Sequence, residues 1–334
     1  MNSTTKPQIF GRDWTMPKVL NLPVTLQPVD YAIAELLDEH DTFTTTQLAH
    51  MLFNSVHTCR RRLYRLFHLE FLLRYIRRGD DETIGWTPGF LSSRYVALQN
   101  NQRPPSRDAV AWRTIRAYAR WDRPLVREAN GFFVRLIRHA RSNPDTALVR
   151  WWSPKTITEK FGDVRSRGHG VWRDGDREVG FFLFLADEEW VILDRETTFL
   201  GQYLALRTLM AVYDQIRFVE EELHAQKQLR EQGGPAYPLL IVFRDQYSES
   251  AFHGRFQNCG FDAMAATTEL EGANSPLGRV WKLLDNVGRH RLADLPNSHR
   301  VPGPRNPGAP TESDDPLRAL KTAQPLRTDI ARRP

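Results

Sequence analysis

The chain has 334 residues, 41% of them hydrophobic, which is enough for two domains with cores of their own. The formal net charge is +6, and the basic residues are mostly arginine, which suits an anionic partner but would also follow from a GC-rich genome. The longest apolar run, Phe181 to Ala186, is too short to cross a bilayer, and the N-terminus has no signal-peptide pattern. Cys59 and Cys259 lack metal-type spacing, so we expect a reduced, cytoplasmic protein without a membrane segment.

Composition divides the chain into four segments. Residues 1–27 contain scattered prolines and predict a flexible arm. A polar stretch with a double proline at 99–108 is expected to link a domain over residues 28–98 to a second domain over residues 109–292. From residue 293 to 334, the abundance of proline, glycine and serine predicts a disordered tail.

The first domain begins with a pattern of three short helices. The first is predicted over residues 29–40, and the second starts after Thr44. Thr44 and Gln47 have the S/T-x-x-Q spacing of a capping box, in which each side chain bonds the backbone N–H of the other residue. A third helix follows, capped by Asn54 or Ser55.

The segment after the third helix is typical of a β-hairpin. Apolar and polar residues alternate on both sides of the turn sequence Gly79-Asp80-Asp81. Three short helices and a hairpin predict a winged helix-turn-helix, whose third helix would enter the major groove of DNA.

Positive charge is concentrated on this third helix and the hairpin. Residues 54–78 hold seven arginines and one acid, whereas residues 30–41 hold five acids and neither Lys nor Arg. A 100° step per residue puts Cys59, Leu63 and Phe67 on the buried side of the helix and Arg61 and Arg65 on the opposite side. The alternative is a solvated arginine face without a ligand.

We predict a set of DNA contacts from this helix and the hairpin. The groove would be reached by His57, Thr58, Arg61, Arg62 and Arg65. Phosphates would be contacted by Arg60, Arg77 and Arg78.

The second domain mixes helices with buried strands. Helical patterns over residues 112–142 precede predicted strands over 147–153, on both sides of the turn at Asp174-Gly175-Asp176, over 237–243 and over 261–268. Largely helical sequence over 190–232 and a helix over 251–258 separate the later strands. This order favours an α/β, nuclease-like core around one sheet.

The segments of both domains, in this order, resemble the replication-relaxation family. The stretches that carry the resemblance include "TTTQLAHMLF", "VRWWS" and, most specifically, "GVWRDGDREVGFFL", within residues 26–268. The family occurs on actinobacterial plasmids and integrative elements. The resemblance implies a winged helix-turn-helix joined to a domain like that of restriction endonucleases, and hence an α+β protein.

The chain departs from the family pattern where a nuclease would hold its metal. Family members often carry an acid at the position of Arg167, a second acid at that of Phe184, and a lysine at that of Leu209. A two-carboxylate site needs neighbouring acids to bind Mg²⁺ and a lysine to stabilise charge. We therefore predict a degenerate domain with no catalytic residue, no bound metal and no cofactor.

Other acids lie near these positions. Glu178 and Asp187 stand at opposite ends of the apolar run, roughly 30 Å apart in an extended strand, so they cannot share one ion. Asp163 and Asp187 could meet on adjacent strands, which leaves a Mg²⁺- or Mn²⁺-dependent nuclease or nickase with relocated ligands as an alternative. We expect these acids to be solvated instead.

Two aromatic or basic features of the second domain have simpler interpretations. His169 has no partner base or nucleophile in the sequence and is interpreted as a hairpin residue. Trp151 and Trp152 could stack on bases, but their strand pattern favours core packing.

The sequence thus predicts a non-catalytic, double-stranded DNA-binding protein. It would act in plasmid or mobile-element replication, in DNA relaxation or transfer, or in their transcriptional control. Its expected partners are DNA and plasmid replication or transfer proteins, and we consider a homodimer because many helix-turn-helix proteins bind DNA as dimers. An interaction adaptor within a relaxation or transfer complex is the other alternative.

Overall fold

The chain folds into a mixed α+β structure with two sheets, which confirms the predicted α+β class. The computed structural model describes residues 26–76, 83–121, 124–161, 166–186, 217, 219–225, 227–228, 231, 237–256, 265–284, 288–295 and 299–300. Among these residues the chain divides into two compact units, of which the first ends at Val134 and the second begins at Arg135.

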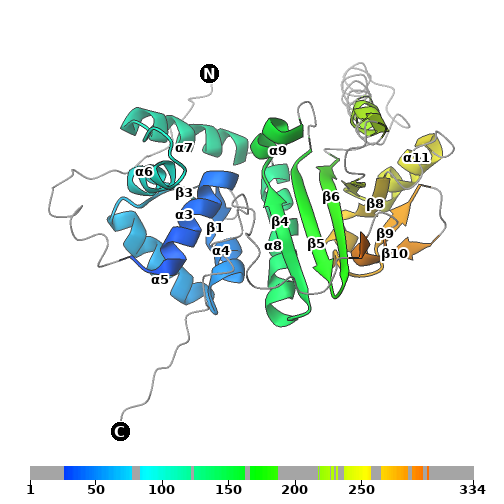
Figure 1. Ribbon diagram of the computed structural model, residues 1–334, viewed down its shortest axis with the longest axis horizontal. Helices are drawn as coiled ribbons and strands as arrows, with labels where there is room; N and C mark the ends of the chain where they lie inside the picture. The colour runs from blue at the N-terminus through cyan, green and yellow to red at the C-terminus, as the bar shows by residue number, and fades with distance from the viewer. Residues whose placement is uncertain are drawn as a thin grey trace, which may run out of the picture. The chain divides into compact units, whose positions relative to one another are not determined.

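The first unit combines helices with a small antiparallel sheet of strand order β1-β3-β2 (Figure 1). Its elements are α3 (Pro28–His40), β1 (Phe43–Thr44), α4 (Thr45–Leu52), α5 (Val56–His68), β2 (Leu72–Ile76), β3 (Ile84–Pro88), α6 (Phe90–Gln99) and α7 (Arg107–Trp121). The three helices predicted in this region and the strands of the hairpin are confirmed. The predicted turn at Gly79-Asp80-Asp81 lies outside the described residues.

The predicted capping box at the start of α4 is also confirmed. The backbone N–H of Gln47 donates to Thr44 Oγ1 at 3.0 Å, and that of Thr44 donates to Gln47 Oε1 at 2.9 Å. Two otherwise unpaired amide groups of the first turn are thus satisfied, and the start of α4 is fixed.

The hairpin of β2 and β3 is held tightly to the helices. Gly85 lies opposite Tyr75, and a Cβ atom on Gly85 would stand 2.3 Å from the Tyr75 ring, so only glycine fits there. The Tyr75 hydroxyl in turn bonds Thr42 Oγ1 at 2.9 Å. On β3, the buried Trp86 donates from Nε1 to Thr45 Oγ1 at 2.9 Å.

The first unit extends past the hairpin to include α7. Arg113 on α7 forms ion pairs with Asp38 and, at 3.0 Å, with Asp41, and the hydroxyls of Thr87 and Thr114 are bonded at 3.2 Å. Our predicted boundary assigns α7 to the second domain, whereas these contacts join α7 to the helices and strands before it. The domain limits themselves stay a prediction.

The second unit is built on a sheet of eight strands among the described residues. Seven follow the order β10-β9-β8-β7-β6-β5-β4, and the eighth, β11, pairs with β6. The strands β4, β5 and β6 are antiparallel, whereas β6, β7 and β8 are parallel. The strands are β4 (Thr146–Trp152), β5 (Gly168–Asp174), β6 (Arg177–Leu185), β7 (Leu239–Phe243), β8 (Ala265–Glu269), β9 (Trp281–Leu283), β10 (Arg289–His290) and β11 (His299–Arg300). Gly175, with φ 60°, makes the predicted turn between β5 and β6.

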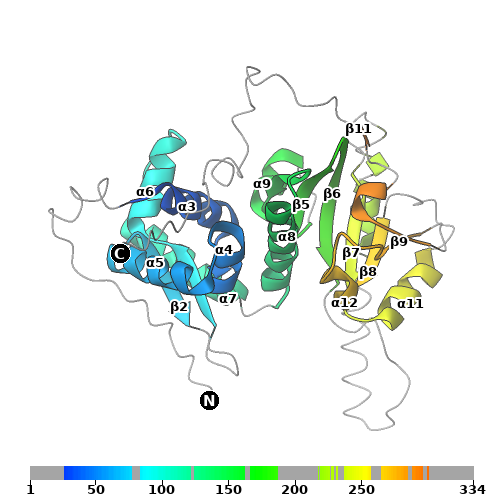
Figure 2. The ribbon, with the colours of Figure 1, turned by 90° about the horizontal axis from the view of Figure 1, so that it is seen from below.

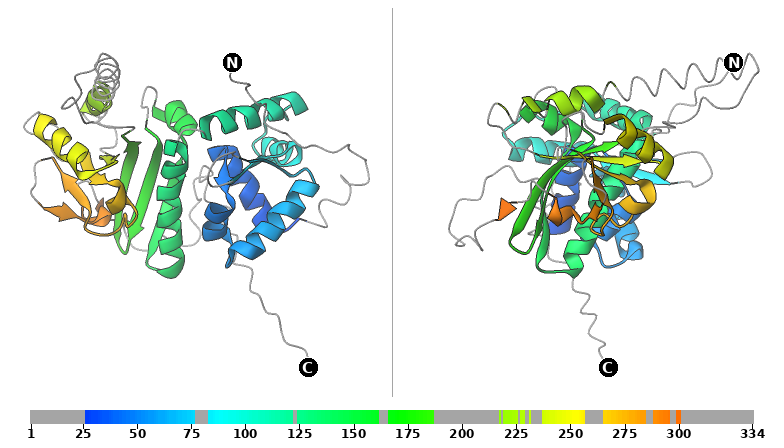
Figure 3. Two further views of the ribbon diagram at one scale, coloured as in Figure 1. Left: turned by 180° about the vertical axis from the view of Figure 1, so that it is seen from behind. Right: turned by 90° about the vertical axis from the view of Figure 1, so that its right-hand side faces the viewer.

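Besides the helical stretch within residues 217–231, four α-helices accompany this sheet among the described residues. They are α8 (Pro124–Ser142), which starts in the first unit, α9 (Pro154–Phe161), α11 (Gln246–Phe256) and α12 (Leu270–Ala273). α11 packs against β7 and β8 (Figure 3 shows this helix in yellow). The Phe252 and Phe243 ring centroids are 5.2 Å apart. Most of the predicted helical region over 190–232 lies outside the described residues, although residues 219–225 are helical.

The structure describes the first residues of the tail that we predicted to be disordered from residue 293. Leu292–Asp294 form a 3₁₀-helix, Leu295 is buried, and β11 pairs with β6. Apolar side chains at 292 and 295 anchor this segment, which the abundance of proline and polar residues around it obscured. Residues 301–334 lie outside the described part of the chain. Within the described part, no helix combines the length and hydropathy needed to cross a membrane.

Candidate nucleic-acid interface

The helix α5 carries most of the predicted DNA contacts and is placed by its N-terminal cap. The backbone N–H of Thr58 donates to Ser55 Oγ at 3.1 Å, so Ser55 is the cap that the sequence left open between two residues. The Ser55 hydroxyl also donates to Thr58 Oγ1 at 2.9 Å. Thr58, a predicted groove contact, is thus half-buried and hydrogen-bonded to the capping residue Ser55.

The two faces of α5 differ sharply in exposure and charge. Cys59, Leu63 and Leu66 are fully buried, and burial raises the pKa of the Cys59 thiol, which excludes a reactive thiolate there. Basic side chains are exposed on the remaining surface, at His57, Arg60, Arg61, Arg65 and His68. The predicted outward position of Arg61 and Arg65 agrees with this pattern.

Arg62, a predicted groove contact, is buried and paired within the first unit. Its side chain is only 9% exposed, and Nε donates to Asp30 Oδ1 at 2.8 Å while Nη2 bonds Oδ2. Asp30 is fully buried in the first turn of α3, where it also accepts the backbone N–H of Gln27 at 2.6 Å. Arg62 therefore ties α5 to α3, because a desolvated guanidinium is stable only with such a partner.

Arg74 on β2 is a basic residue near α5 that our site prediction omitted. Its guanidinium carbon lies 4.9 Å from the centre of the Tyr64 ring and 4.7 Å from that of Phe67, both on α5 (Figure 2 shows α5 and β2). Stacking on two rings holds the hairpin against the helix. The sequence places Arg74 on a strand, but strand alternation cannot reveal which helix residues it meets.

Arg77 and Arg78, the predicted phosphate contacts of the hairpin, lie outside the described residues. The strand that leads to them ends at Ile76, which is 47% exposed.

The second unit places the two family acid positions at one end of neighbouring strands. The backbone N–H of Arg167, just before β5, donates to the carbonyl of Leu183 on β6 at 2.7 Å. Phe184 on β6 is 5% exposed and belongs to a core cluster with Trp152, Phe182 and Ile241. A side chain in this position fills the core and supplies no oxygen to a metal.

Of the acids that could replace them, only Glu178 lies among the described residues. Glu178 accepts a hydrogen bond from Arg173 Nε on the opposite strand at 2.6 Å, whereas Asp163, Asp187 and Leu209 lie outside the described residues. Among the residues that the structure describes, no three His, Cys, Asp or Glu side chains are grouped so that they could hold a metal ion.

His169 and the two tryptophans lie in the core. Trp151 and Trp152 are 1% and 7% exposed, which confirms their predicted packing role. His169 is fully buried in β5, and its ring stacks on Trp152 with 4.8 Å between centroids. Burial, together with the charge of Arg150, lowers the His169 pKa to about 3, so the ring is neutral near pH 7.

Comparison with known proteins adds one finding. Residues 35–189 match the family model described as replication-relaxation. The match confirms the resemblance predicted from the sequence, and it spans α5 as well as the β4–β5–β6 strands. No curated protein and no solved structure gave a match.

Proposed function

We propose that residues 28–98 form a winged helix-turn-helix that binds double-stranded DNA, with α5 in the major groove. The order α3-β1-α4-α5-β2-β3 and the small antiparallel sheet are typical of that fold and support the assignment. The observation that carries the proposal is the exposed basic face of α5, which has a fully buried apolar face behind it.

Within this proposal, the arginines of α5 have different roles. Arg61 and Arg65 contact base edges together with His57, and Arg60 contacts phosphate from the flank of the helix. Arg77 and Arg78 are proposed to contact phosphate from the hairpin. Arg62 is left out, because its pairing with Asp30 supports a structural role.

We propose that the second unit is a non-catalytic relative of restriction-endonuclease folds. A helix, three antiparallel strands and a further strand parallel to the third support this likeness. The buried Phe184 in place of an acid supports the lack of catalysis. The family match supports a role in the replication or DNA relaxation of plasmids and mobile elements, alongside proteins of that machinery.

The proposal is tested by first identifying the DNA. Fragments that co-purify with the protein would be sequenced to define a target duplex, and affinities for this duplex and an unrelated one would be compared. We expect Arg61→Ala to reduce the preference for the target, since a good bidentate base contact contributes about 1–3 kcal/mol. Wild-type protein that binds both duplexes equally would contradict sequence-specific recognition.

A further inference from the structure

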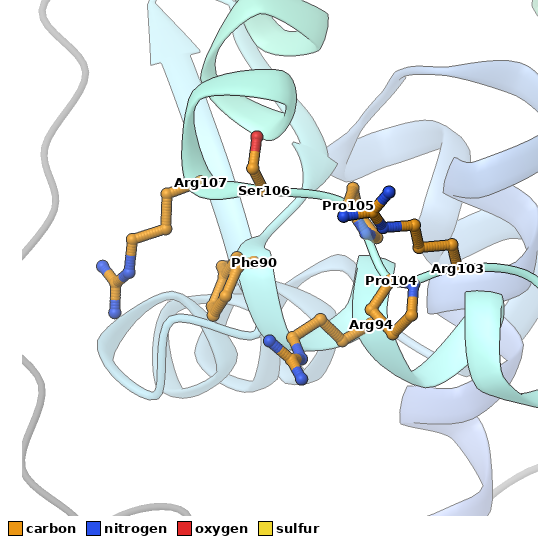
Figure 4. Close-up of a pocket in the computed structure, with 7 residues that line it drawn as sticks. All are labelled: Phe90, Arg94, Arg103, Pro104, Pro105, Ser106 and Arg107. Carbon is orange, nitrogen blue, oxygen red and sulfur yellow. The ribbon is translucent and has the colours of Figure 1, made fainter.

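A pocket of the first unit, separate from the basic face of α5, is lined by three arginines. It has a volume of about 530 Å³ and lies between the start of α6 and the segment that leads into α7. Its lining residues are Phe90, Arg94, Arg103, Pro104, Pro105, Ser106 and Arg107. Figure 4 shows Phe90 between Arg94 and Arg107, with Arg103 beside the two prolines.

Two of the pocket arginines stack on its aromatic residue, and the third precedes its prolines. The guanidinium carbons of Arg94 and Arg107 lie 5.4 and 4.8 Å from the centre of the Phe90 ring. Arg103 directly precedes the double proline, whose rings fix two backbone φ angles. The positive charges of Arg94 and Arg107 are therefore held beside the Phe90 ring before any ligand binds, which lowers the ordering entropy lost on binding.

The charge of this pocket is only partly balanced within the described residues. Glu70 lies 3.8 Å from Arg107, which is a loose ion pair. Arg94 and Arg103 are exposed and form no ion pair with any carboxylate in the part of the chain that the structure describes. A bound anion would therefore be attracted by at least the two guanidiniums of Arg94 and Arg103.

The lining groups favour a phosphate among anions. Guanidinium forks match the oxygens of phosphate, and three arginines can bind several oxygens at once. The Ser106 hydroxyl accepts the backbone N–H of Ala109 at 3.1 Å and keeps its own hydrogen for donation to an oxygen. The Phe90 ring already lies beneath two guanidiniums, so it is less suited to stack on a base.

The pocket is also close to the end of α5. Glu70, the partner of Arg107, follows α5 by two residues, and the Gly89 N–H donates to the Phe71 carbonyl at 3.0 Å just before Phe90. Arg61 and His68 are separated by roughly 10 Å along the helix axis. Duplex DNA carries one negative charge per about 1.7 Å of its axis, so a duplex bound by α5 would have phosphates beyond this end of the helix.

We propose that this arginine pocket binds a phosphate group, either a phosphodiester of the DNA backbone or a free phosphate. The phosphodiester source rests on the proposed DNA binding by α5. Binding of free phosphate does not depend on DNA binding by α5, so the pocket proposal and the proposed function can be contradicted separately.

The test compares the full-length protein with three double variants. Arg94→Ala/Arg103→Ala removes two pocket charges, and Arg116→Ala/Arg138→Ala removes two exposed arginines elsewhere as a matched control. Arg61→Ala/Arg65→Ala removes the α5 contacts.

Each protein would be titrated with duplex DNA at several salt concentrations and, at constant ionic strength, with inorganic phosphate in a calorimeter. Arg94→Lys retains the charge and checks whether the guanidinium fork matters.

For a phosphodiester, the pocket variant should bind DNA about tenfold more weakly than the control variant, as for one lost charge-assisted contact. Its plot of log affinity against log salt should be shallower by about one. If the pocket binds free phosphate, the pocket variant should release no heat when titrated with inorganic phosphate, while its affinity for DNA should equal that of the control variant. Pocket and control variants that behave alike in both titrations would overturn the proposal. An α5 variant with unchanged DNA affinity would instead count against the proposed function.

Discussion

The helix α5 and the strand β6 both attract functional interpretation, but their side chains are placed in opposite ways. On α5, five basic side chains are exposed around a buried apolar face. On β6, Phe181, Phe182 and Leu183 are fully buried, and Phe184 is 5% exposed where family members often carry an acid. The basic face of α5 therefore remains exposed, whereas the side chains of β6 from Phe181 to Phe184 fill the core.

Arg62 refines this comparison, because not every basic residue of α5 is available. Arg61 and Arg62 are adjacent and chemically identical, yet one is exposed and the other is buried against Asp30. Charge density along the sequence thus overestimates the contact surface, and only the partner of each arginine separates a ligand contact from a structural ion pair.

The largest effect is expected from restoring an acid on β6. Phe184→Asp should destabilise the protein by about 5 kcal/mol, because it removes a buried ring and leaves a carboxylate in an apolar core. Phe184→Leu is the control and should cost less than about 1.5 kcal/mol. Urea unfolding would measure both. An Asp variant that keeps its stability and nicks supercoiled plasmid with Mn²⁺ would show that the position belongs to a metal site.

A smaller loss of stability is expected at the ion pair between α3 and α5. Asp30→Ala should cost about 3–4 kcal/mol, because the buried Arg62 guanidinium then lacks its carboxylate. Arg61→Ala, one residue away but exposed, should change stability by less than about 0.5 kcal/mol. The urea unfolding midpoints of the two variants would be compared. Equal midpoints would contradict a structural role for the Arg62–Asp30 ion pair.

The pH dependence of stability tests the burial of His169 in the second unit. The folded protein resists protonation of His169 until about pH 3, whereas the unfolded chain takes up that proton near pH 6.5. The unfolded state therefore binds more protons between these values, and stability falls as the pH drops through this window. His169→Phe should reduce the slope by up to about 1.4 kcal/mol per pH unit. Urea midpoints from pH 7 to pH 4 would show it, and parallel curves for variant and wild type would contradict it.

Much of the local structure could be predicted because it depends on local spacing. The Thr44–Gln47 capping box, the outward Arg61 and Arg65, and the turn at Gly175 each follow from residues within a few positions of one another. These features need no knowledge of the rest of the chain.

The contacts that sequence reasoning missed join distant residues. Arg62 meets Asp30 across 32 positions, Arg74 stacks on α5 from a strand, and Leu295 is buried in a segment that was predicted to be disordered. Helical periodicity gives the direction of a side chain but not its partner. The arginine pocket likewise depends on a proline segment and a helix start, which no repeat or motif connects.

The most direct test of DNA binding by α5 measures the affinity of the full-length protein for one duplex by fluorescence anisotropy. Wild type, Arg61→Ala/Arg65→Ala and the control Arg116→Ala/Arg138→Ala would be compared at several salt concentrations. We expect the α5 variant to lose about 2–6 kcal/mol of binding free energy, from two base contacts of about 1–3 kcal/mol each, while the control loses far less. An α5 variant that binds as tightly as the control would contradict the central claim.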